Sequence, residues 1–251
     1  MAPWFKFAYH YLWIAPHVLL LGVAAILYLR RLHKNFPVFF IYTIYEFFEF
    51  VLLFGFYISG HSFTTATYRF VYIPTLLGST ALRFGIIHEI FINIFSDYPQ
   101  LAAIAKSSIR WVTAVLVIAA ASSVLYFSGP TPDAMVGIRL LERSVNIIQV
   151  GLLFFLLLFS RVFGLSWRSY IFGIAIGFAI SACAAIAAWT IGLMPLTEES
   201  KYLLDLVPMG SFHLTVLVWL GYLIVAEKVV GLATYTPHEM DRWAGELEQS
   251  K

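Results

Sequence analysis

Length, composition and charge restrict this protein to a membrane. Of its 251 residues, 61% are hydrophobic, 18% aromatic and only 12% charged, whereas about 25% of the residues in a soluble domain are usually charged. Helices of about 20 residues with short connections allow roughly seven or eight spans and leave no room for a soluble domain. The net charge of +2 is too small to indicate nucleic-acid binding, and the single cysteine excludes an intrachain disulfide.

Seven apolar runs are each long enough to cross a bilayer as a helix. In chain order they cover residues 11–29, 37–58, 70–95, 111–127, 136–160, 169–193 and 209–229. Polar clusters such as RRLHK and SGPTPD separate neighbouring runs, and MPLTEESKYLLDLVP is expected to be the longest polar connection. Pro16, Pro74 and Pro208 are expected at or just inside helix entrances, where a missing amide hydrogen costs little.

The predicted architecture is therefore all-α. Residues 1–230 are expected to form a polytopic, seven-helix transmembrane bundle, and residues 231–251 a cytoplasmic tail. In the tail, Thr236, Pro237 and Glu239 have the pattern of a capping box with a first-turn proline. This pattern predicts a short amphipathic helix that lies on the membrane surface.

Basic residues near the ends of the predicted spans indicate the orientation. The turns after the odd-numbered spans hold eight of them, namely Arg30, Arg31, Lys34, Lys106, Arg110, Arg161, Arg168 and Lys228. The opposite side holds four, namely Lys6, Arg69, Arg139 and Lys201. Cytoplasmic loops are enriched in Lys and Arg. We therefore expect an external N-terminus, a cytoplasmic C-terminus and a multi-pass location in a bacterial inner membrane.

Ionisable residues inside the predicted spans are the main functional signal, because each costs about 2.5–3.5 kcal/mol on insertion scales. In the second span, Tyr42, Glu46 and Glu49 share one helical face at spacings of four and three. The third span carries Arg83 near mid-depth. Nearer the cytoplasm, the third span also carries His88, Glu89 and Asn93.

The outer half of the fifth predicted span is polar as well, with Glu142, Asn146 and Gln149 on one face and Arg143 beside them. We expect an outward-facing polar pocket that binds a small molecule or an ion. Its ligand-binding residues would be Glu49, Arg83, Glu142, Arg143, Asn146 and His213. Arginine would clamp an anionic or polar group through its fixed fork of donors, and the amide and imidazole would orient that group.

This pocket predicts a sensor- or receptor-like membrane protein that acts through a partner protein or as a subunit of a membrane complex. The sequence leaves open whether this function uses a cofactor. A different interpretation is that the buried polar groups only neutralise one another, for instance Glu46 or Glu49 with Arg83, and thereby fix the packing of the helices.

Two other functions stay open. A proton- or ion-coupled transporter would use Glu46, His88 and Glu89 as a proton relay. A b-haem electron-transfer or assembly subunit would use His17 and His213 as axial ligands. Covalent retinal is disfavoured, because the only lysine that the last span offers is Lys228 at its very end. An enzyme is the less favoured class, because no nucleophile is paired with a base at a recognisable spacing.

Small residues in the sixth predicted span form a ridge at four-residue spacing, made of Gly173, Gly177 and Ser181. Such a ridge lets two helices approach closely. The partner helix would come either from the same bundle or from a second copy of the chain, so a homo-oligomer through these three residues is one of the two interpretations.

The segments LERSVNIIQVGLLFFLLLFSRVFGLSWRSYIFGIAIGF, YEFFEFVLLF and IIHEIFINIF resemble a broad set of uncharacterised heptahelical bacterial membrane proteins, seen especially in acidobacteria. The resemblance extends over most of the chain and implies seven membrane spans without implying an activity. More loosely, the chain is similar to the seven-span sensory regions of bacterial histidine kinases. It departs from them because no kinase domain follows Val229, so signalling would require a separate partner.

Overall fold

The computed structural model describes residues 3–59, 66–94, 143, 145–152, 154–155, 168–192, 194–195 and 197–225. In this part of the chain every regular element is a helix. The helices are α1 (Pro3–Leu29), the short 3₁₀ turn η1 (Leu32–Lys34), α2 (Pro37–Ile58), α3 (Ala66–Ile94), α6 (Tyr170–Gly192) and α7 (Glu198–Val225). Residues 145–152 and 154–155 are helical as well.

Five of these helices are long and apolar enough to cross a membrane, so the chain is a multi-pass membrane protein. The membrane-crossing stretches are Phe7–Leu29, Pro37–Ile58, Pro74–Ile94, Tyr170–Gly192 and Ser200–Val225. Each has 21 to 26 residues, enough to cover the hydrocarbon thickness of about 30 Å at 1.5 Å per residue. A helix is the natural form of such a stretch, because it satisfies every backbone hydrogen bond without water.

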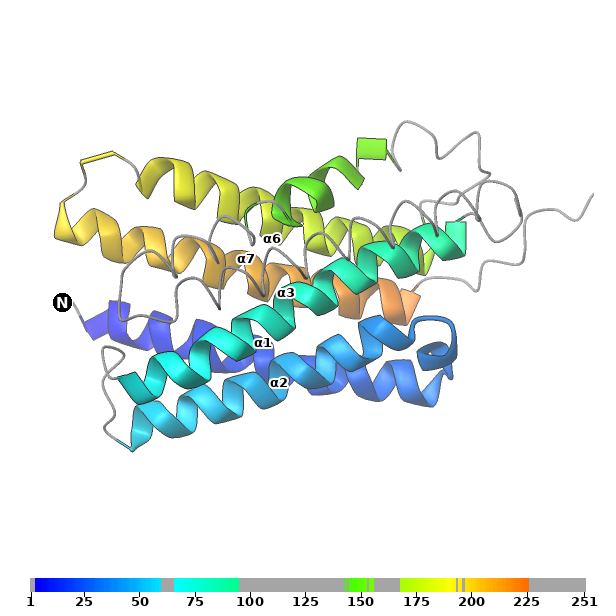
Figure 1. Cartoon of the computed structure of the whole chain (residues 1–251), viewed down its shortest axis with the longest axis horizontal. Helices are drawn as coiled ribbons and strands as arrows, with labels where there is room; N and C mark the ends of the chain where they lie inside the picture. The colour runs from blue at the N-terminus through cyan, green and yellow to red at the C-terminus, as the bar shows by residue number, and fades with distance from the viewer. Residues whose placement is uncertain are drawn as a thin grey trace, which may run out of the picture.

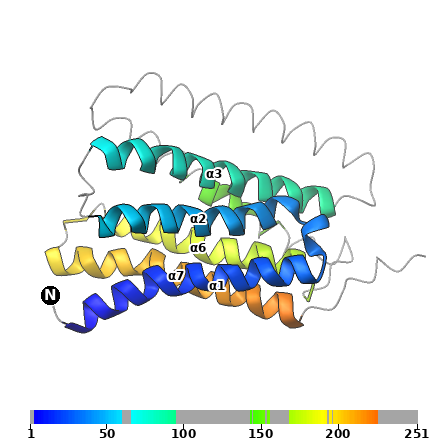
Figure 2. The same cartoon turned by 90° about the horizontal axis from the view of Figure 1, so that it is seen from below.

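The five helices pack as a bundle in which neighbours in space are not always neighbours in sequence. α3 packs on α2, α2 on α1, α1 on α7 and α7 on α6, and α3 makes a smaller contact with α6. Figure 1 shows α1 and α7 running side by side in the same direction, and Figure 2 shows the same bundle from below. Near the start of both helices, the Phe5 and Tyr202 rings lie 5.9 Å apart. Near their ends, the Arg30 guanidinium bonds the Leu223 carbonyl at 2.7 Å.

We call the end of the bundle that holds η1 the turn end, and the opposite end the N-terminal end. α1, α3 and α7 run toward the turn end, whereas α2 and α6 run away from it (Figure 1). α1 finishes at the turn end with Arg31 in the left-handed conformation, at φ 58°. Pro37 then begins α2 at its first turn, where its fixed φ suits the helix and its missing N–H is not needed.

The structure corrects the predicted boundaries at the N-terminal end. α7 begins at Glu198 rather than near residue 209, so much of the predicted polar connection is helix. The Thr197 hydroxyl accepts a hydrogen bond from the Ser200 amide at 3.3 Å, which caps this start. The prolines Pro16, Pro74 and Pro208 all lie inside helices and not at their entrances, because α1, α3 and α7 each begin further upstream than predicted.

The small-residue ridge of α6 is used inside the chain. A side chain at Gly173 would collide with Tyr222, and one at Gly177 would collide with Trp219, both on α7. Ser181 Oγ lies 3.0 Å from Thr215 Oγ1, and the Thr215 hydroxyl donates to the Gly177 carbonyl at 2.8 Å. The ridge therefore packs on α7 of the same chain, as the intrabundle interpretation predicts. The homo-oligomer interpretation stays a prediction.

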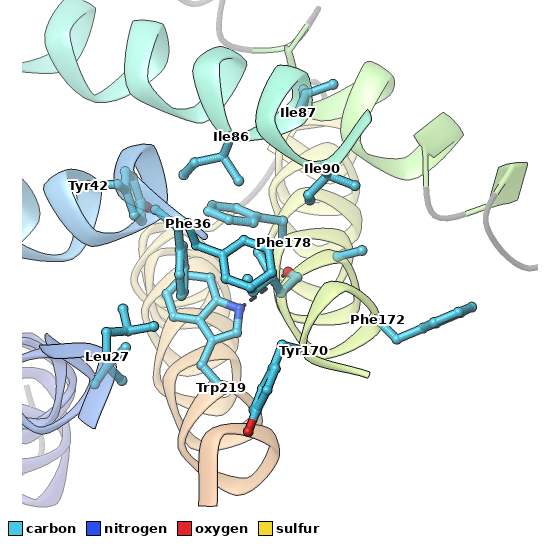
Figure 3. Packing of buried hydrophobic residues seen from close by; sticks show 14 of the residues in the cluster. Leu27, Phe36, Tyr42, Ile86, Ile87, Ile90, Tyr170, Phe172, Phe178 and Trp219 are labelled. Carbon is cyan, nitrogen blue, oxygen red and sulfur yellow. Dashed lines mark hydrogen bonds between the residues drawn. The ribbon is translucent and has the colours of Figure 1, made fainter. Parts of the chain in front are cut away.

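An aromatic cluster lies where α2, α6 and α7 meet, and Figure 3 shows its rings gathered around Trp219. The Trp219 ring centroid lies 5.0 Å from that of Phe39 and 4.9 Å from that of Phe178, and Tyr42 lies 5.3 Å from Phe178. The Trp219 indole N–H donates to the Ile174 carbonyl at 3.3 Å. Phe39, Tyr42 and Trp219 are almost fully buried, so this aromatic cluster locks the α6–α7 pair onto α2.

Three predictions lie outside the described residues. These are the fourth span at 111–127, parts of the fifth span at 136–160, and the tail helix in 231–251.

Candidate functional site

A polar network joins α2 to α3 in the middle of the membrane-crossing stretches. The Ser79 hydroxyl of α3 donates a short hydrogen bond to Oε1 of Glu46 on α2. The Tyr42 hydroxyl lies close to both the Glu46 carboxylate and the Arg83 guanidinium. Glu46 and Ser79 are buried. An acid, a cation and two hydroxyls therefore share one site between two helices, and we call these four residues the α2–α3 network.

The rest of the α2–α3 contact explains why these groups come so close. Gly78 lies under Tyr45, where any side chain would collide with the Tyr45 ring. The Tyr45 hydroxyl donates to the Thr75 carbonyl at 2.9 Å. Glu49 is partly buried three residues beyond Glu46, toward the N-terminal end. Glycine thus allows the close approach, and the tyrosine hydroxyl finds a partner on the opposite helix.

Glu89 has a structural role at the turn end. Its carboxylate accepts hydrogen bonds from the first amides of α2, at 2.7 Å from Val38 N and 3.0 Å from Phe39 N. The residue at the N-cap position, Phe36, has no side chain that can do this. A carboxylate at this position satisfies the free amides and complements the positive end of the helix dipole. These contacts give Glu89 a capping role, and its part in a proton relay stays a prediction.

Two more side chains hold the turn end together. Asn93 donates to the Asn35 carbonyl at 3.2 Å and to the Glu89 carbonyl at 2.9 Å, which ties α3 to the connection between α1 and α2. Arg30 donates to the Leu223 and Ile224 carbonyls at 2.7 and 3.2 Å. Those carbonyls belong to the last described turn of α7, so Arg30 ties the end of α1 to α7.

The segment that carries the predicted fifth-span residues has a buried polar face. Asn146 and Gln149 are 4% and 3% exposed, on the same face as the buried Val145 and Leu152. Among the described residues, the Asn146 Oδ1 and Gln149 Nε2 atoms have no hydrogen-bond partner although both are buried. We call these two residues the amide pair. Glu142, predicted beside them, lies outside the described residues.

The Arg143 side chain packs against α6. Its guanidinium carbon lies 3.8 Å from the centroid of the Trp189 ring, a cation–π contact. Further along the same segment, the Phe155 ring lies 5.7 Å from that of Phe91 on α3. The segment therefore runs from the N-terminal half of the bundle toward the turn end, between α3 and α6.

The two predicted haem ligands lie on α1 and α7 at similar depth. The His17 ring stacks on Phe50 with centroids 4.5 Å apart and lies 5.3 Å from Phe212, while His213 meets the edge of Tyr11 at 5.5 Å. His17 Nδ1 is 2.6 Å from the Trp13 carbonyl, which can only accept, so this nitrogen carries the hydrogen.

These surroundings argue against a haem between the two imidazoles. α1 and α7 pack directly on one another, and a Cβ atom at Gly22 of α1 would lie 3.7 Å from Leu220 of α7. A porphyrin would require these helices to separate. In the described part of the chain, no three His, Cys, Asp or Glu side chains gather as a metal site.

The structure thus brings Glu46, Tyr42 and Arg83 together and adds Ser79, which sequence reasoning missed. The ligand-binding role of Arg83 stays a prediction. The Arg143 side chain contacts Trp189 on α6, and the His213 ring contacts Tyr11 on α1. His88 is partly buried on α3. The capping role of Glu89 was also missed, although one sequence signal was present: an apolar Phe36 stands before Pro37, where a helix start usually has a polar cap.

Comparison with known proteins adds no function to this geometry. The chain matches no protein-family model, no curated protein and no solved structure.

Proposed function

We propose that this protein binds a small polar molecule or ion at a site inside its helix bundle, and acts as a membrane sensor through a partner or as a subunit of a membrane complex. The observation that carries this proposal is the amide pair, whose Asn146 Oδ1 and Gln149 Nε2 are buried without a partner among the described residues.

Buried amide atoms are almost always hydrogen-bonded, because leaving one unsatisfied costs roughly 1–3 kcal/mol. The cost is harder to avoid within a bilayer, where bulk water cannot reach the group. Asn146 Oδ1 needs a donor and Gln149 Nε2 needs an acceptor. An occupant with both kinds of group would satisfy the pair, which favours a small polar molecule, or an ion with its bound water.

Depth supports a role for Arg83 in the same site. Counting along the chain from the Phe91–Phe155 contact, Arg83 lies about 12 Å and Asn146 about 13.5 Å toward the N-terminal end, at 1.5 Å per helical residue. A guanidinium and two amides at one level on neighbouring helices would bind an anionic or polar group, with Glu46 balancing the arginine charge.

The α2–α3 network also contacts the aromatic cluster, which would transmit the effect of a bound ligand to α6 and α7. Tyr42 belongs both to this network and to the aromatic cluster around Trp219. A change in how Arg83 and Glu46 engage Tyr42 would therefore reach the α6–α7 pair through packed rings. This is the route by which a bound ligand would alter the face that a partner protein contacts.

The test is a native mass spectrum and an absorption spectrum of protein purified in mild detergent. We expect wild type to be colourless and to carry a discrete extra mass, and we expect Arg83→Ala to insert into the membrane but to lose that mass. Arg168→Ala, at an exposed arginine before α6, is the control and should keep it. An inserted Arg83→Ala protein that retains the mass would contradict the proposal, and a Soret band would replace it with a haem function.

We further propose that the chain crosses the membrane seven times, as in the heptahelical bacterial proteins that it resembles. α3 ends and α6 begins at the turn end, so the intervening chain crosses an even number of times. The helical residues between 143 and 155 supply one crossing toward the turn end, which requires one more before them. With Arg30, Arg31, Lys34 and Arg168 at the turn end, the positive-inside rule favours a cytoplasmic turn end and an external N-terminus in a bacterial inner membrane.

A further inference from the structure

Two exposed cations lie at the turn end, at the level where a membrane-spanning helix meets lipid headgroups. The crossing stretch of α1 ends at Leu29 and that of α2 begins at Pro37, so Arg31 and Lys34 lie between two spans and outside the hydrocarbon. Both are exposed. This position holds whichever side of the membrane the turn end faces.

The backbone of Arg31 is in a conformation that an arginine rarely adopts. Its φ of 58° is the left-handed region, and it occupies the position just after a helix where glycine is usually found, because glycine has no Cβ to clash there. An arginine at this position destabilises the turn relative to glycine. Backbone requirements therefore favour glycine, and the charged side chain must be explained by another interaction.

The neighbouring Arg30 has hydrogen-bond partners, whereas Arg31 has none among the described residues. Arg30 donates to the Leu223 and Ile224 carbonyls of α7, whereas no hydrogen bond within the described residues engages the side chain of Arg31 or Lys34. Beside them, Tyr28 and Leu29 are 63% and 78% exposed at the end of the hydrocarbon-crossing stretch. Tyr28 is held in place by stacking on His33, with centroids 5.2 Å apart.

We propose that Arg31 and Lys34 bind the phosphate of an anionic phospholipid whose acyl chains lie against Tyr28 and Leu29. The guanidinium fork matches two phosphate oxygens, and the lysine ammonium adds a second charge. Basic residues just outside a spanning helix attract anionic lipids, and an aromatic ring at the interface suits the boundary between headgroup and chain. The exposed apolar side chains make a lipid a better match than a free phosphate ion.

The test is lipid titration followed by native mass spectrometry. Wild-type protein in detergent is titrated with phosphatidylglycerol or with phosphatidylcholine of the same acyl chains. We expect a preference for phosphatidylglycerol, and a loss of about fivefold in its affinity in Arg31→Gly and in Lys34→Gln, the factor for one cation near a charged surface. Phosphatidylcholine binding should not change. Lys201→Gln, an exposed lysine at the N-terminal end, is the matched control and should behave as wild type.

Arg31→Gly suits this test because it removes the charge and also relieves the backbone, so the variant should fold at least as well as wild type. Unchanged phosphatidylglycerol preference in folded Arg31→Gly and Lys34→Gln would overturn the proposal. Competition by inorganic phosphate separates the two sources of the anion. Displacement of the lipid by millimolar phosphate would show a phosphate-ion site instead, and failure to displace it supports the lipid.

Discussion

At the scale of single residues, charged side chains at the turn end complete the ends of helices on other parts of the chain. Glu89 of α3 accepts hydrogen bonds from the first amides of α2, and Arg30 donates to the Leu223 and Ile224 carbonyls in the last described turn of α7. Both contacts join residues far apart in sequence. The start of α2 is therefore satisfied by a tertiary contact with α3 and not by a local side-chain cap.

Removing the Glu89 carboxylate should destabilise the bundle. Glu89→Ala leaves the Val38 and Phe39 amides without an acceptor and removes the charge at the start of α2, so we expect a loss of about 1–2 kcal/mol in the free energy of unfolding. Glu89→Gln keeps one acceptor and should lose less. Unfolding in mixed detergent micelles measures both. Equal stability of Glu89→Ala and wild type would contradict the capping role.

Arg31→Gly should stabilise the protein, whereas Glu89→Ala should destabilise it. Relief of the left-handed backbone at φ 58° is expected to raise the free energy of unfolding by about 1 kcal/mol in detergent without anionic lipid. Arg31→Ala, which loses the same charge but keeps a Cβ, is the control and should gain little. If the two variants are equally stable, the backbone is not strained at this position.

The sequence predicted that Glu46 and Arg83 lie inside the bundle, because a charge in an apolar run must face other helices rather than lipid. It could not predict their partners, since periodicity fixes the face of one helix but not its register against the next. Ser79 is an ordinary residue in its span, and only the close approach at Gly78 makes it a partner of Glu46. The roles of Arg30 and Glu89 depend in the same way on which helix ends meet.

At the scale of the helices, the α6–α7 pair depends on the absence of side chains at Gly173 and Gly177. Tyr222 and Trp219 occupy the space over these glycines, and the Thr215 hydroxyl donates a hydrogen bond to the Gly177 carbonyl. Between helices in a bilayer such close packing replaces the hydrophobic effect as the main attraction.

Gly177→Ala should therefore destabilise the protein by about 1–3 kcal/mol through overpacking against Trp219. Gly210→Ala, at a glycine of α7 with open space around it, is the matched control and should cost nothing. Thermal unfolding in detergent, followed by tryptophan fluorescence, reports both. A Gly177→Ala protein as stable as Gly210→Ala would show that the two helices are not in close contact there.

Span centres were predictable from apolar runs, and the C-terminal limits of α1, α2 and α6 agree with prediction to within about one residue. The start of α7 was not predictable in this way. Residues 198–208 are polar enough to resemble a loop, but water outside the bilayer does not prevent a helix that Thr197 caps. An apolar run shows which residues lie in the hydrocarbon of the bilayer, but the helix can extend beyond that run into water.

At the scale of the whole molecule, the topology makes a prediction that labelling can test. Single cysteines introduced in a Cys183→Ser background at positions 2 and 131 should react with an impermeant thiol reagent added to intact cells. Cysteines at positions 34 and 168 should react only after the membrane is opened. Labelling of position 131 from the cytoplasmic side would contradict the proposed seven crossings.

We propose that the amide pair faces an occupant and is not part of a purely structural network. The most direct measurement compares Asn146→Leu/Gln149→Leu with Ile147→Leu, a change at an exposed neighbour on the same segment, by native mass spectrometry and by unfolding. We predict that the double variant loses the bound mass while its ligand-free stability stays equal to or above that of wild type, because no unsatisfied amide remains. A double variant that is destabilised by several kcal/mol relative to ligand-free wild type, with no bound mass in either protein, would contradict the account.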